Sequence, residues 1–195
     1  MSNIHATAII DSSAEIDPSV EIGAYTIVGK NVVIRSGSKI SSHVVIQDNT
    51  EIGENNEIFQ FSSIGEIPQD KKYQGEKSKL IVGKNNPIRE YCTINRGTKA
   101  GGKSTTEVGD NNWIMAYVHI AHDCVVGNNN IMSNATSLAG HVEVGNFTVL
   151  AGYVLVHQFC KVGDYAFAGM GAALNQDLPP YLLATGSFAK THGLN

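Results

Sequence analysis

Aliphatic side chains recur at every sixth position along most of this chain. The register begins at Ile4, breaks twice, and continues to Leu174. A period of six matches neither the 3.6-residue repeat of an amphipathic helix nor the alternation of a simple hairpin. A short period sustained over such a length predicts a solenoid, in which each repeat packs on its neighbours. The positions in register are Ile4, Ile10, Ile16, Ile22, Val28, Ile34, Ile40, Ile46, Ile52, Ile58, Ile64, Val82, Ile88, Ile94, Val108, Ile114, Ile120, Val126, Met132, Leu138, Val144, Leu150, Val156, Val162, Ala168 and Leu174.

Each six-residue unit has room for one short strand and one turn, with its aliphatic side chain pointing inward. Three such faces would close a triangular coil, and successive coils would stack about 4.8 Å apart, the spacing of paired strands. Glycine often follows the inward residue, as at Gly23, Gly53 and Gly127, and we expect these glycines to adopt positive φ at tight corners. The sequence therefore predicts an all-β fold, a parallel β-helix with the outline of a triangular prism.

The three cysteines share one position in this repeat. Cys92, Cys124 and Cys160 each stand two residues before an inward position, where small or β-branched side chains are usual. A buried free cysteine behaves as a small hydrophobic residue, and three scattered cysteines do not make a disulfide framework. We therefore expect core thiols without a chemical role.

The two breaks in register predict loops that project from a rigid scaffold. The first, residues 65–79, is polar and rich in lysine, and the second, residues 95–107, is rich in glycine. Loops on rigid scaffolds are common places for function. We expect the β-helix to span residues 1–178 with these two excursions, followed by a short tail over residues 179–195.

Composition narrows the possible functions. The chain of 195 residues is 42% hydrophobic and 16% charged, with a formal net charge of −4, so a nucleic-acid partner is not expected. The N-terminus has neither the basic nor the apolar region of a secretory signal, and no apolar run approaches the roughly 20 residues of a membrane span. We therefore expect a cytoplasmic protein without an integral membrane segment.

Histidines align on one edge of the predicted prism. Residues eighteen apart lie above one another, so Gly140 lies over His122, with His141 beside it. His157 lies near the next level, two residues before Phe159, which is eighteen residues after His141. None of these three histidines occupies an inward position, so we expect their imidazoles to face outward along one edge.

Two chemistries are open for these histidines. Neutral imidazoles suit zinc, and three histidines at neighbouring levels resemble the layout of zinc-bearing γ-class carbonic anhydrases. That zinc family also needs two ligands five apart on one chain, and this spacing is absent here. Alternatively, Asp123 could orient His122 as a general base, and the Gly140 N–H could stabilise an oxyanion. This second set suffices for acyl transfer to an alcohol.

Longer stretches of the chain resemble the UDP-N-acetylglucosamine O-acyltransferase family, which acts at the start of lipid A biosynthesis in Gram-negative bacteria. The resemblance covers essentially the whole chain and is most specific in the IAHDC, VHQFC and QDKKY segments. It implies a left-handed β-helix, a homotrimer with sites between neighbouring chains, and no cofactor or metal. It also implies a 3-hydroxyacyl donor carried on acyl carrier protein. The matching runs are NEIFQFSSIGEIPQDKKYQGE, IREYCTINRGT, HIAHDCVVGNNNIMSNATSLAGHVEVG, VHQFCKVGDYAFAGMGA and NQDLPPYLLATG.

The resemblance assigns catalytic roles residue by residue. His122 matches the general base that takes the proton from the sugar 3-hydroxyl, and Asp123 matches its partner. The N–H of Gly140 matches the donor to the thioester oxyanion.

The resemblance also assigns binding roles. His141 and Gln158 match residues near the acyl and sugar groups, and His157 matches a binding residue on the same edge. Asp70 and Lys72, in the first excursion, match positions that contact sugar and phosphate, so Lys72 would meet the charge of the acceptor.

One position predicts chain length. Met170 matches the far end of the family's acyl groove, where a small residue would leave room and methionine fills it. We expect a shorter 3-hydroxyacyl donor, nearer ten carbons than fourteen.

The chain also departs from the family. The family continues into a C-terminal helical domain that helps hold the nucleotide and the carrier protein, whereas this sequence stops at Asn195. Asn95 stands where some members carry histidine. N-acylation of an amino-sugar nucleotide, or a trimer that binds ligand with little activity, therefore remain alternatives to O-acylation.

Overall fold

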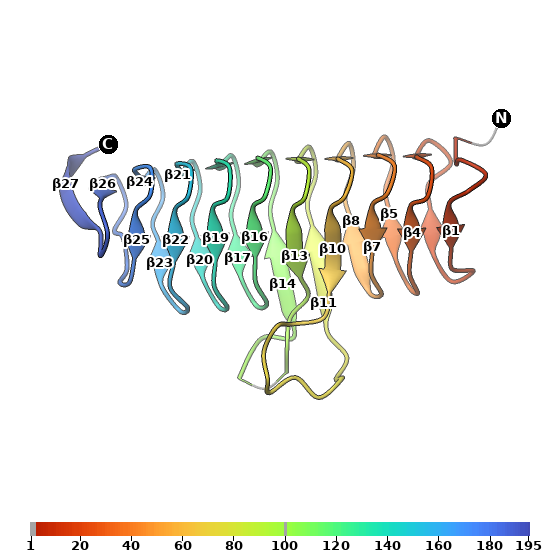
Figure 1. Cartoon of the computed structure of the whole chain (residues 1–195), viewed down its shortest axis with the longest axis horizontal. Coiled ribbons are helices and arrows are strands. Elements are labelled where there is room, and N and C mark those ends of the chain that lie inside the picture. The colour runs from red at the N-terminus through yellow and green to blue at the C-terminus, as the bar shows by residue number, and fades with distance from the viewer. Residues whose placement is uncertain (1–2, 100) are drawn as a thin grey trace.

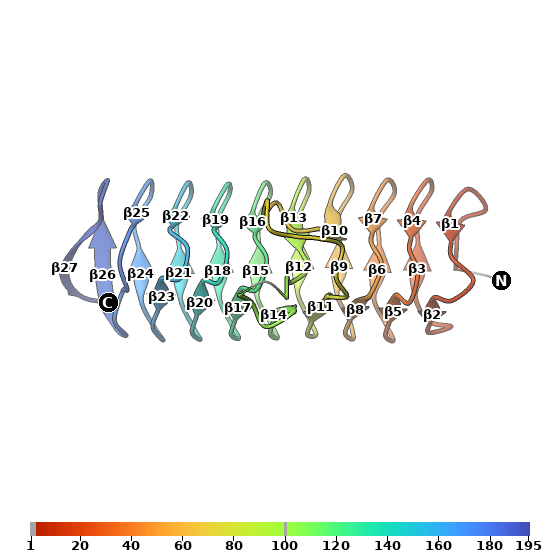
Figure 2. The same ribbon diagram turned by 90° about the horizontal axis from the view of Figure 1, so that it is seen from below.

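The computed structural model describes residues 3–99 and 101–195, and within these ranges it contains strands and turns but no helix. The strands follow one another around a long prism, with β1 (Ile9–Ile10) and β27 (Lys190–Leu194) at opposite ends of its axis (Figure 1). A view from below shows the same regular stacking, with one projection near the middle (Figure 2). None of the described residues belongs to a helix long and apolar enough to cross a membrane.

Three sheets form the sides of the prism, and pairing within them is parallel apart from the last pair, β26 with β27. The first sheet contains β1 (Ile9–Ile10), β4 (Ile27–Val28), β7 (Val45–Ile46), β10 (Ser63–Glu66), β13 (Thr93–Asn95), β16 (His119–Ile120), β19 (Ser137–Leu138), β22 (Leu155–Val156) and β25 (Ala173–Leu174). The second sheet contains β2 (Glu15–Ile16), β5 (Val33–Ile34), β8 (Thr50–Ile52), β11 (Lys79–Val82), β14 (Thr105–Val108), β17 (Val125–Val126), β20 (Glu143–Val144) and β23 (Lys161–Val162). The third sheet contains β3 (Glu21–Ile22), β6 (Lys39–Ile40), β9 (Glu57–Ile58), β12 (Pro87–Ile88), β15 (Trp113–Ile114), β18 (Ile131–Met132), β21 (Val149–Leu150), β24 (Phe167–Ala168), β26 (Leu182–Thr185) and β27 (Lys190–Leu194).

The strand register confirms the predicted coil of eighteen residues. Ile9 pairs with Ile27, and Ile120 pairs with Leu138. The predicted inward residues form one continuous core: those from Ile22 to Leu174 are buried, and only Ile4, Ile10 and Ile16 in the first coil are partly exposed. Burial of these aliphatic side chains is the main stabilising contribution to the prism.

The explanation predicted for the corner glycines is wrong. Gly23, Gly53 and Gly127 do not have positive φ. Instead, their backbones lie against the next coil: a Cβ on Gly23 would lie 2.5 Å from the Ser42 nitrogen, and one on Gly127 would lie 2.5 Å from the Gly145 oxygen. Close stacking of coils, rather than left-handed backbone, is what requires glycine at these positions.

The left-handed backbone lies two residues further along each corner, mostly at residues other than glycine. One corner, between the third and first sheets, carries aromatic residues with positive φ, and the corner between the second and third sheets carries mainly asparagine. Asparagine tolerates this conformation because its side chain can hydrogen-bond locally. The aromatic corner stacks Tyr25, His43, Phe61, Tyr91 and Tyr117 in a row with ring centroids 5.0–5.4 Å apart.

The cysteines are core residues, as predicted. Cys92, Cys124 and Cys160 are free and buried. Burial raises the pKa of Cys92 and of Cys124 to about 12. At neutral pH these thiols are protonated, and only the thiolate is a good nucleophile or metal ligand.

Both excursions leave from the same corner, between the first and second sheets. The first excursion, residues 67–78, connects β10 to β11, and the second excursion, residues 96–104, connects β13 to β14. They are shorter than the expected ranges 65–79 and 95–107 because the flanking strands extend beyond two residues and pair with each other, as Leu80 does with Thr106. Residues 1, 2 and 100 of the expected ranges lie outside the described residues.

The segment after residue 178 adds strands to the end of the prism. β26 pairs in parallel with β24 and so continues the third sheet, and β27 then pairs antiparallel with β26. The side chains of β27 are exposed.

Candidate active site

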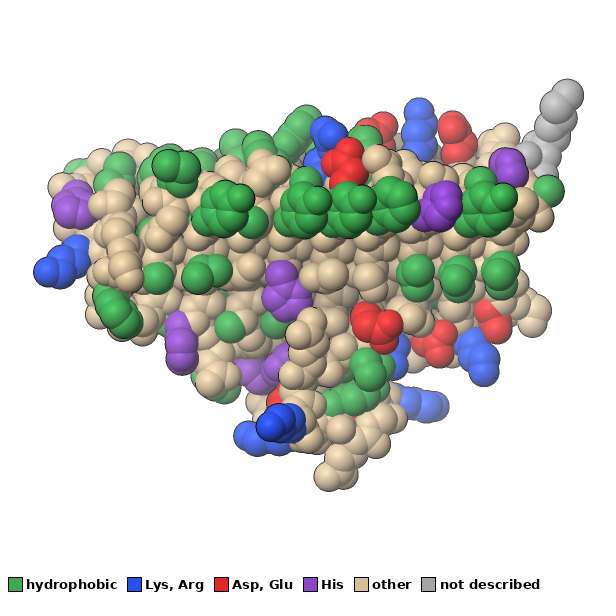
Figure 3. Space-filling view, viewed as in Figure 1, with side chains coloured by type: hydrophobic (Ala, Val, Ile, Leu, Met, Phe, Trp, Pro, Cys, Tyr) green, Lys and Arg blue, Asp and Glu red, His purple; other side chains and the backbone are tan. Residues whose placement is uncertain are grey.

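The sequence-predicted histidines lie at the corner from which both excursions project. His122 and Asp123 lie between β16 and β17, and His141 occupies the corresponding corner one coil later. The N–H of His141 donates to the carbonyl of His122 at 3.0 Å, which ties the two levels together. Figure 3 shows histidine side chains at the base of the projection, which carries lysine and arginine side chains further out.

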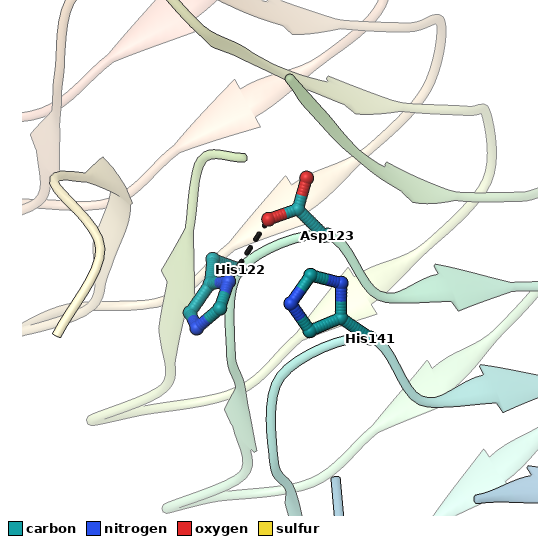
Figure 4. Close-up of side chains that lie close together, drawn as sticks. All are labelled: His122, Asp123 and His141. Carbon is teal, nitrogen blue, oxygen red and sulfur yellow. Dashed lines mark hydrogen bonds and ion pairs between the residues drawn. The ribbon is translucent and has the colours of Figure 1, made fainter. Parts of the chain in front are cut away.

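His122 and Asp123 form a hydrogen-bonded pair. Asp123 Oδ2 lies 2.9 Å from His122 Nδ1, and the side chain of Asp123 is fully buried (Figure 4). An ionised carboxylate only accepts hydrogen bonds, so Nδ1 carries the proton that it donates to Asp123. The second ring nitrogen, Nε2, is then left with a lone pair that can accept a proton from a ligand.

Gly140 packs directly on this imidazole. A Cβ at this position would lie 2.7 Å from both Cε1 and Nε2 of His122. Among the described residues, no carbonyl or side chain accepts a hydrogen bond from the N–H of Gly140. A base nitrogen and a free backbone donor therefore lie side by side, one coil apart.

His141 packs against the ring of His122. Its ring lies edge-on to His122 with centroids 5.0 Å apart, and it stacks on Phe159 at 4.5 Å. Burial lowers the pKa of His141, while the charges of Asp123 and Asp70 raise it in part. His141 is therefore neutral at pH 7 and can both donate and accept a hydrogen bond.

His119 lies beside the site on the outer face of β16. Its Nδ1 is 2.7 Å from the hydroxyl oxygen of Thr93 on the preceding coil. Burial lowers the pKa of His119, and a positive charge on His122 lowers it further. A second neutral histidine thus borders the pair.

A cavity of about 510 Å³ joins the corner to the first excursion. Its size is within the range of small-molecule sites. Asp70, Lys72, His122, His141 and Gln158 all line it, so residues to which the family resemblance assigned roles lie together. The remaining lining residues are Gln69, Lys71, Gly101 and Phe159.

Two of the residues predicted to contact the substrates do not line this cavity. His157 is exposed, and its Nδ1 lies 3.1 Å from the carbonyl oxygen of the neighbouring Gln158. Met170 is 81% exposed and lies at the corner between the third and first sheets, at the other end of the first-sheet strands from His122. The outer face of the first sheet separates these two corners.

The metal hypothesis fits these residues less well than the acid–base hypothesis. Nitrogen and oxygen atoms of His122, Asp123 and His141 lie within 4.8 Å of one another, close enough to hold a metal ion. However, His122 Nδ1 and Asp123 Oδ2 are already hydrogen-bonded to each other. Backbone N–H groups of Thr98 and Lys103 also donate to the Asp123 carboxylate. The Asp123 carboxylate and His122 Nδ1 are thus engaged, which leaves only His122 and His141 of this group to offer nitrogen ligands, fewer than the three protein ligands of a catalytic zinc site.

Some neighbours of the site were not predicted from the sequence. Phe159 could have been found, because it stands eighteen residues after His141. The contacts of Thr98 and Lys103 with Asp123 could not be predicted from the six-residue repeat, because both residues belong to the second excursion, where the register is broken.

Comparison with known proteins gives consistent results. The bacterial transferase hexapeptide family (six repeats) matches residues 105–140. An acyl-[acyl-carrier-protein]–UDP-N-acetylglucosamine O-acyltransferase of Halorhodospira halophila is 53% identical over 137 residues, which are 70% of this chain and 53% of that protein. The corresponding enzyme of Aliarcobacter butzleri is 52% identical over 195 residues, covering 100% of this chain and 75% of that protein. The chain thus spans about half the length of the first of these relatives.

Solved structures agree in fold. UDP-N-acetylglucosamine O-acyltransferase from Moraxella catarrhalis superposes with a TM-score of 0.98 at 49% identity, covering 99% of this chain and 75% of that one. The Arabidopsis UDP-N-acetylglucosamine acyltransferase superposes with a TM-score of 0.86 at 38% identity, covering 98% of this chain and 74% of that one. The predicted left-handed parallel β-helix is confirmed.

Proposed function

This chain belongs to the UDP-N-acetylglucosamine O-acyltransferase family, and we propose that it transfers a 3-hydroxyacyl chain from acyl carrier protein to the 3-hydroxyl of UDP-N-acetylglucosamine. This reaction is the first step of lipid A biosynthesis. The observation that carries the proposal is the His122–Asp123 pair beside the N–H of Gly140, at the mouth of a cavity that a basic loop completes.

His122 would act as the general base. Its Nε2 accepts the proton of the sugar 3-hydroxyl while the hydroxyl oxygen attacks the thioester carbonyl carbon. An alcohol is a poor nucleophile at neutral pH, so removal of this proton is needed for attack. Asp123 keeps the proton of the neutral ring on Nδ1 and stabilises the imidazolium that forms.

Gly140 would stabilise the intermediate. Attack places a negative charge on the former carbonyl oxygen, and the N–H of Gly140 donates to that oxyanion. Collapse of the intermediate breaks the carbon–sulfur bond, and the departing thiolate takes the proton from His122. The products are the 3-O-acylated sugar nucleotide and the free thiol of the carrier protein.

The cavity supports the proposed substrate-binding roles. Asp70 and Lys72 reach it from the first excursion, with Lys72 as the cation for the acceptor's phosphates. His141 and Gln158 face the same space and would contact the acyl and sugar groups. His157, outside the cavity of the isolated chain, would contact ligand from the same edge.

The acyl chain would extend across the outer face of the first sheet towards Met170. Leu155, 54% exposed on β22, lies on this face and offers an apolar surface to a hydrocarbon chain. Met170 stands at its far corner and would limit the length of chain that fits.

We also propose a homotrimer in the cytoplasm of a Gram-negative bacterium, with no cofactor or metal. Exposed aromatic residues along one corner, including Tyr25, Tyr117 and Tyr153, give the prism an apolar strip suited to contact with other copies. Sedimentation equilibrium would measure the mass in solution, and a monomer would contradict a site shared between chains.

The decisive experiment compares transfer by the wild type and by His122→Ala. The donor is a 3-hydroxyacyl carrier protein and the acceptor is UDP-N-acetylglucosamine. We expect the variant to lose about 10²–10⁴-fold in rate, the usual effect of removing a general base. His192→Ala, which removes an exposed histidine of β27, is the control and should retain activity. Equal rates for the wild type and His122→Ala would eliminate His122 as the base.

Two alternatives remain testable in the same assay. Replacing the acceptor by a 3-amino-sugar nucleotide tests N-acylation, and faster transfer to the amine would favour that reading. Calorimetric binding of UDP-N-acetylglucosamine without turnover would indicate a trimer that binds ligand with little activity.

A further inference from the structure

The Asp123 carboxylate lies in a cage of backbone groups that the repeat does not supply. Its Oδ2 accepts a hydrogen bond from the N–H of Thr98 at 3.0 Å, and its Oδ1 accepts one from the N–H of Lys103 at 2.9 Å. Both donors belong to the second excursion. His141 and Phe159 occupy the corresponding corner position on the next two coils, and neither is fully buried. The excursion is therefore what buries Asp123.

Gly102 forms a wall of this cage. A Cβ on Gly102 would overlap the Asp123 Oδ1 and the carbonyl oxygen of Thr98. The φ of Gly102 is not in the left-handed region. The need for glycine here comes from close approach to the carboxylate, not from the backbone conformation.

Glu76, in the first excursion, holds the second excursion in place. Its Oε1 accepts hydrogen bonds from the Thr98 hydroxyl at 2.6 Å and from the Lys99 N–H at 3.0 Å, and its Oε2 accepts one from the Gln74 N–H at 2.8 Å. Tyr73 adds a second link, because its hydroxyl oxygen accepts a hydrogen bond from Arg96.

Glu76 is charged throughout the pH range in which the protein would work. The hydrogen bond from the Thr98 hydroxyl, followed by those from backbone N–H groups, lowers the pKa of Glu76 to about 2. Hydrogen bonds to an ionised acceptor are stronger than neutral ones. The link between the two excursions is therefore charge-assisted.

We propose that the second excursion is a positioning device for the catalytic pair, with Gly102, Thr98 and Lys103 fixing Asp123 and with Glu76 fixing the excursion. Asp123 then holds His122 in the tautomer that carries its proton on Nδ1. Gly102 and Glu76 touch no substrate in this scheme and act through Asp123. The proposal rests on the proposed acyl transfer, in which His122 is the base.

The principal test is Gly102→Ala. The added methyl group displaces the carboxylate, so we expect kcat to fall by about 10²-fold, the order expected for misplacing a catalytic group by about 1 Å. The KM for UDP-N-acetylglucosamine should stay within about twofold, because Lys72 and Gln158 are untouched. Gly152→Ala is the matched control: its Cβ would lie 3.6 Å from the Asn134 oxygen, an ordinary contact.

A second readout does not depend on activity. Nitrogen-15 NMR of the His122 imidazole distinguishes the two neutral tautomers. We expect the Nδ1–H form in the wild type and in Gly152→Ala, and a mixture of both forms in Gly102→Ala. Wild-type kcat and an unchanged tautomer in Gly102→Ala would overturn the proposal.

Glu76 provides an independent pair of variants, which decides the question if Gly102→Ala does not fold. Glu76→Gln keeps an oxygen acceptor for Thr98 and Lys99, whereas Glu76→Ala removes it. We expect Glu76→Ala to lose kcat and the Nδ1–H tautomer, and Glu76→Gln to restore most of both. Equal behaviour of the two variants would contradict the role of Glu76. If the wild type transfers no acyl group, the proposed function fails, and the tautomer alone decides the positioning role.

Discussion

At the residue scale, one corner gives neighbouring side chains different environments. Asp123 is buried and held by backbone donors, His122 bonds to it, and His141 stacks on Phe159. These differences do not come from residue type alone, because His122, His141 and His157 are all histidines of the same edge. They come from which group lies on the next coil and from which excursion covers it.

The neutral histidines predict how stability depends on pH. Burial lowers the pKa of His119 below its ordinary value of 6.5. As the pH falls below about 6.5, the unfolded chain binds a proton that folded His119 does not bind, so the free energy of unfolding decreases. The decrease caused by His119 stops once the pH lies below the pKa of His119 in the folded state, because both states then bind the proton.

We therefore expect the melting temperature of the wild type to decrease between pH 7.5 and pH 5.5. His119→Gln keeps a hydrogen-bonding partner for Thr93 but cannot titrate, so its melting temperature should decrease less over the same interval. Thermal melts at the two pH values measure the difference. An identical decrease in both proteins would show that His119 does not contribute.

Met170 predicts donor selectivity. We expect the wild type to transfer a ten-carbon 3-hydroxyacyl chain faster than a fourteen-carbon chain, because the methionine fills the far end of the proposed groove. Met170→Gly should raise the relative rate with the longer chain at least about tenfold, the factor that one or two buried methylene groups can supply. Rates with the two carrier-protein donors test this, and fastest transfer of the fourteen-carbon chain by the wild type would refute it.

At the element scale, the strands are too short to be stable alone, and polar ladders between coils supplement their pairing. A row of buried asparagines runs along the corner between the second and third sheets. The Asn112 Oδ1 accepts a hydrogen bond from the N–H of Asn130, and the Asn130 Oδ1 accepts one from the N–H of Thr148. Each amide also donates to a carbonyl of the next coil, as Asn130 does to Gly145. Buried polar groups that are satisfied in this way specify the register of stacking.

Asn130→Ala should therefore destabilise the protein strongly. It leaves the N–H of Thr148 and the carbonyl of Gly145 without these partners. Each lost buried partner costs about 1–3 kcal/mol, so we expect a loss of about 2–6 kcal/mol. Urea unfolding measures it. Glu107→Ala, at an exposed position of β14, should change stability by less than about 0.5 kcal/mol. A loss for Asn130→Ala as small as that of the control would mean that water replaces the ladder.

At the scale of the whole molecule, the prism is a one-dimensional stack with two excursions on one corner. Each coil contacts mainly its neighbours, so the central coils are covered on both sides and the first coil on one side only. Ile10 and Ile16 are partly exposed, whereas Ile94 and Ile120 are fully buried.

This arrangement predicts graded protection against hydrogen exchange. The amides of β13 and β16, near the His122–Asp123 pair, should exchange slowest, and those of β1 and β2 should exchange fastest, because local opening begins where few buried contacts hold the chain. Hydrogen exchange followed by mass spectrometry of peptides would measure the gradient. Uniform protection from β1 to β16 would contradict a stack held by neighbouring coils.

The sequence by itself determined the prism. A period of six places Ile88, Ile114 and their counterparts in the core. An interval of eighteen places Gly140 on His122, because strand pairing stacks residues that are eighteen apart on successive coils. The hand of the coil came from resemblance, since the spacing is the same for either hand. The sequence showed that glycine follows the inward positions, but the predicted positive φ was wrong. Glycine is needed there because the next coil lies too close for a Cβ, and the sequence of one repeat does not show that contact.

Tertiary structure alone decided what surrounds the His122–Asp123 pair. Glu76, Thr98 and Gly102 lie in segments where the register is broken, so no interval along the sequence relates them to Asp123. Their positions depend on both excursions leaving the same corner and closing on each other through hydrogen bonds. In a repeat, the spacing along the chain determines where each residue lies in the fold. In a loop, the position of a residue depends on the tertiary contacts that form when the chain folds.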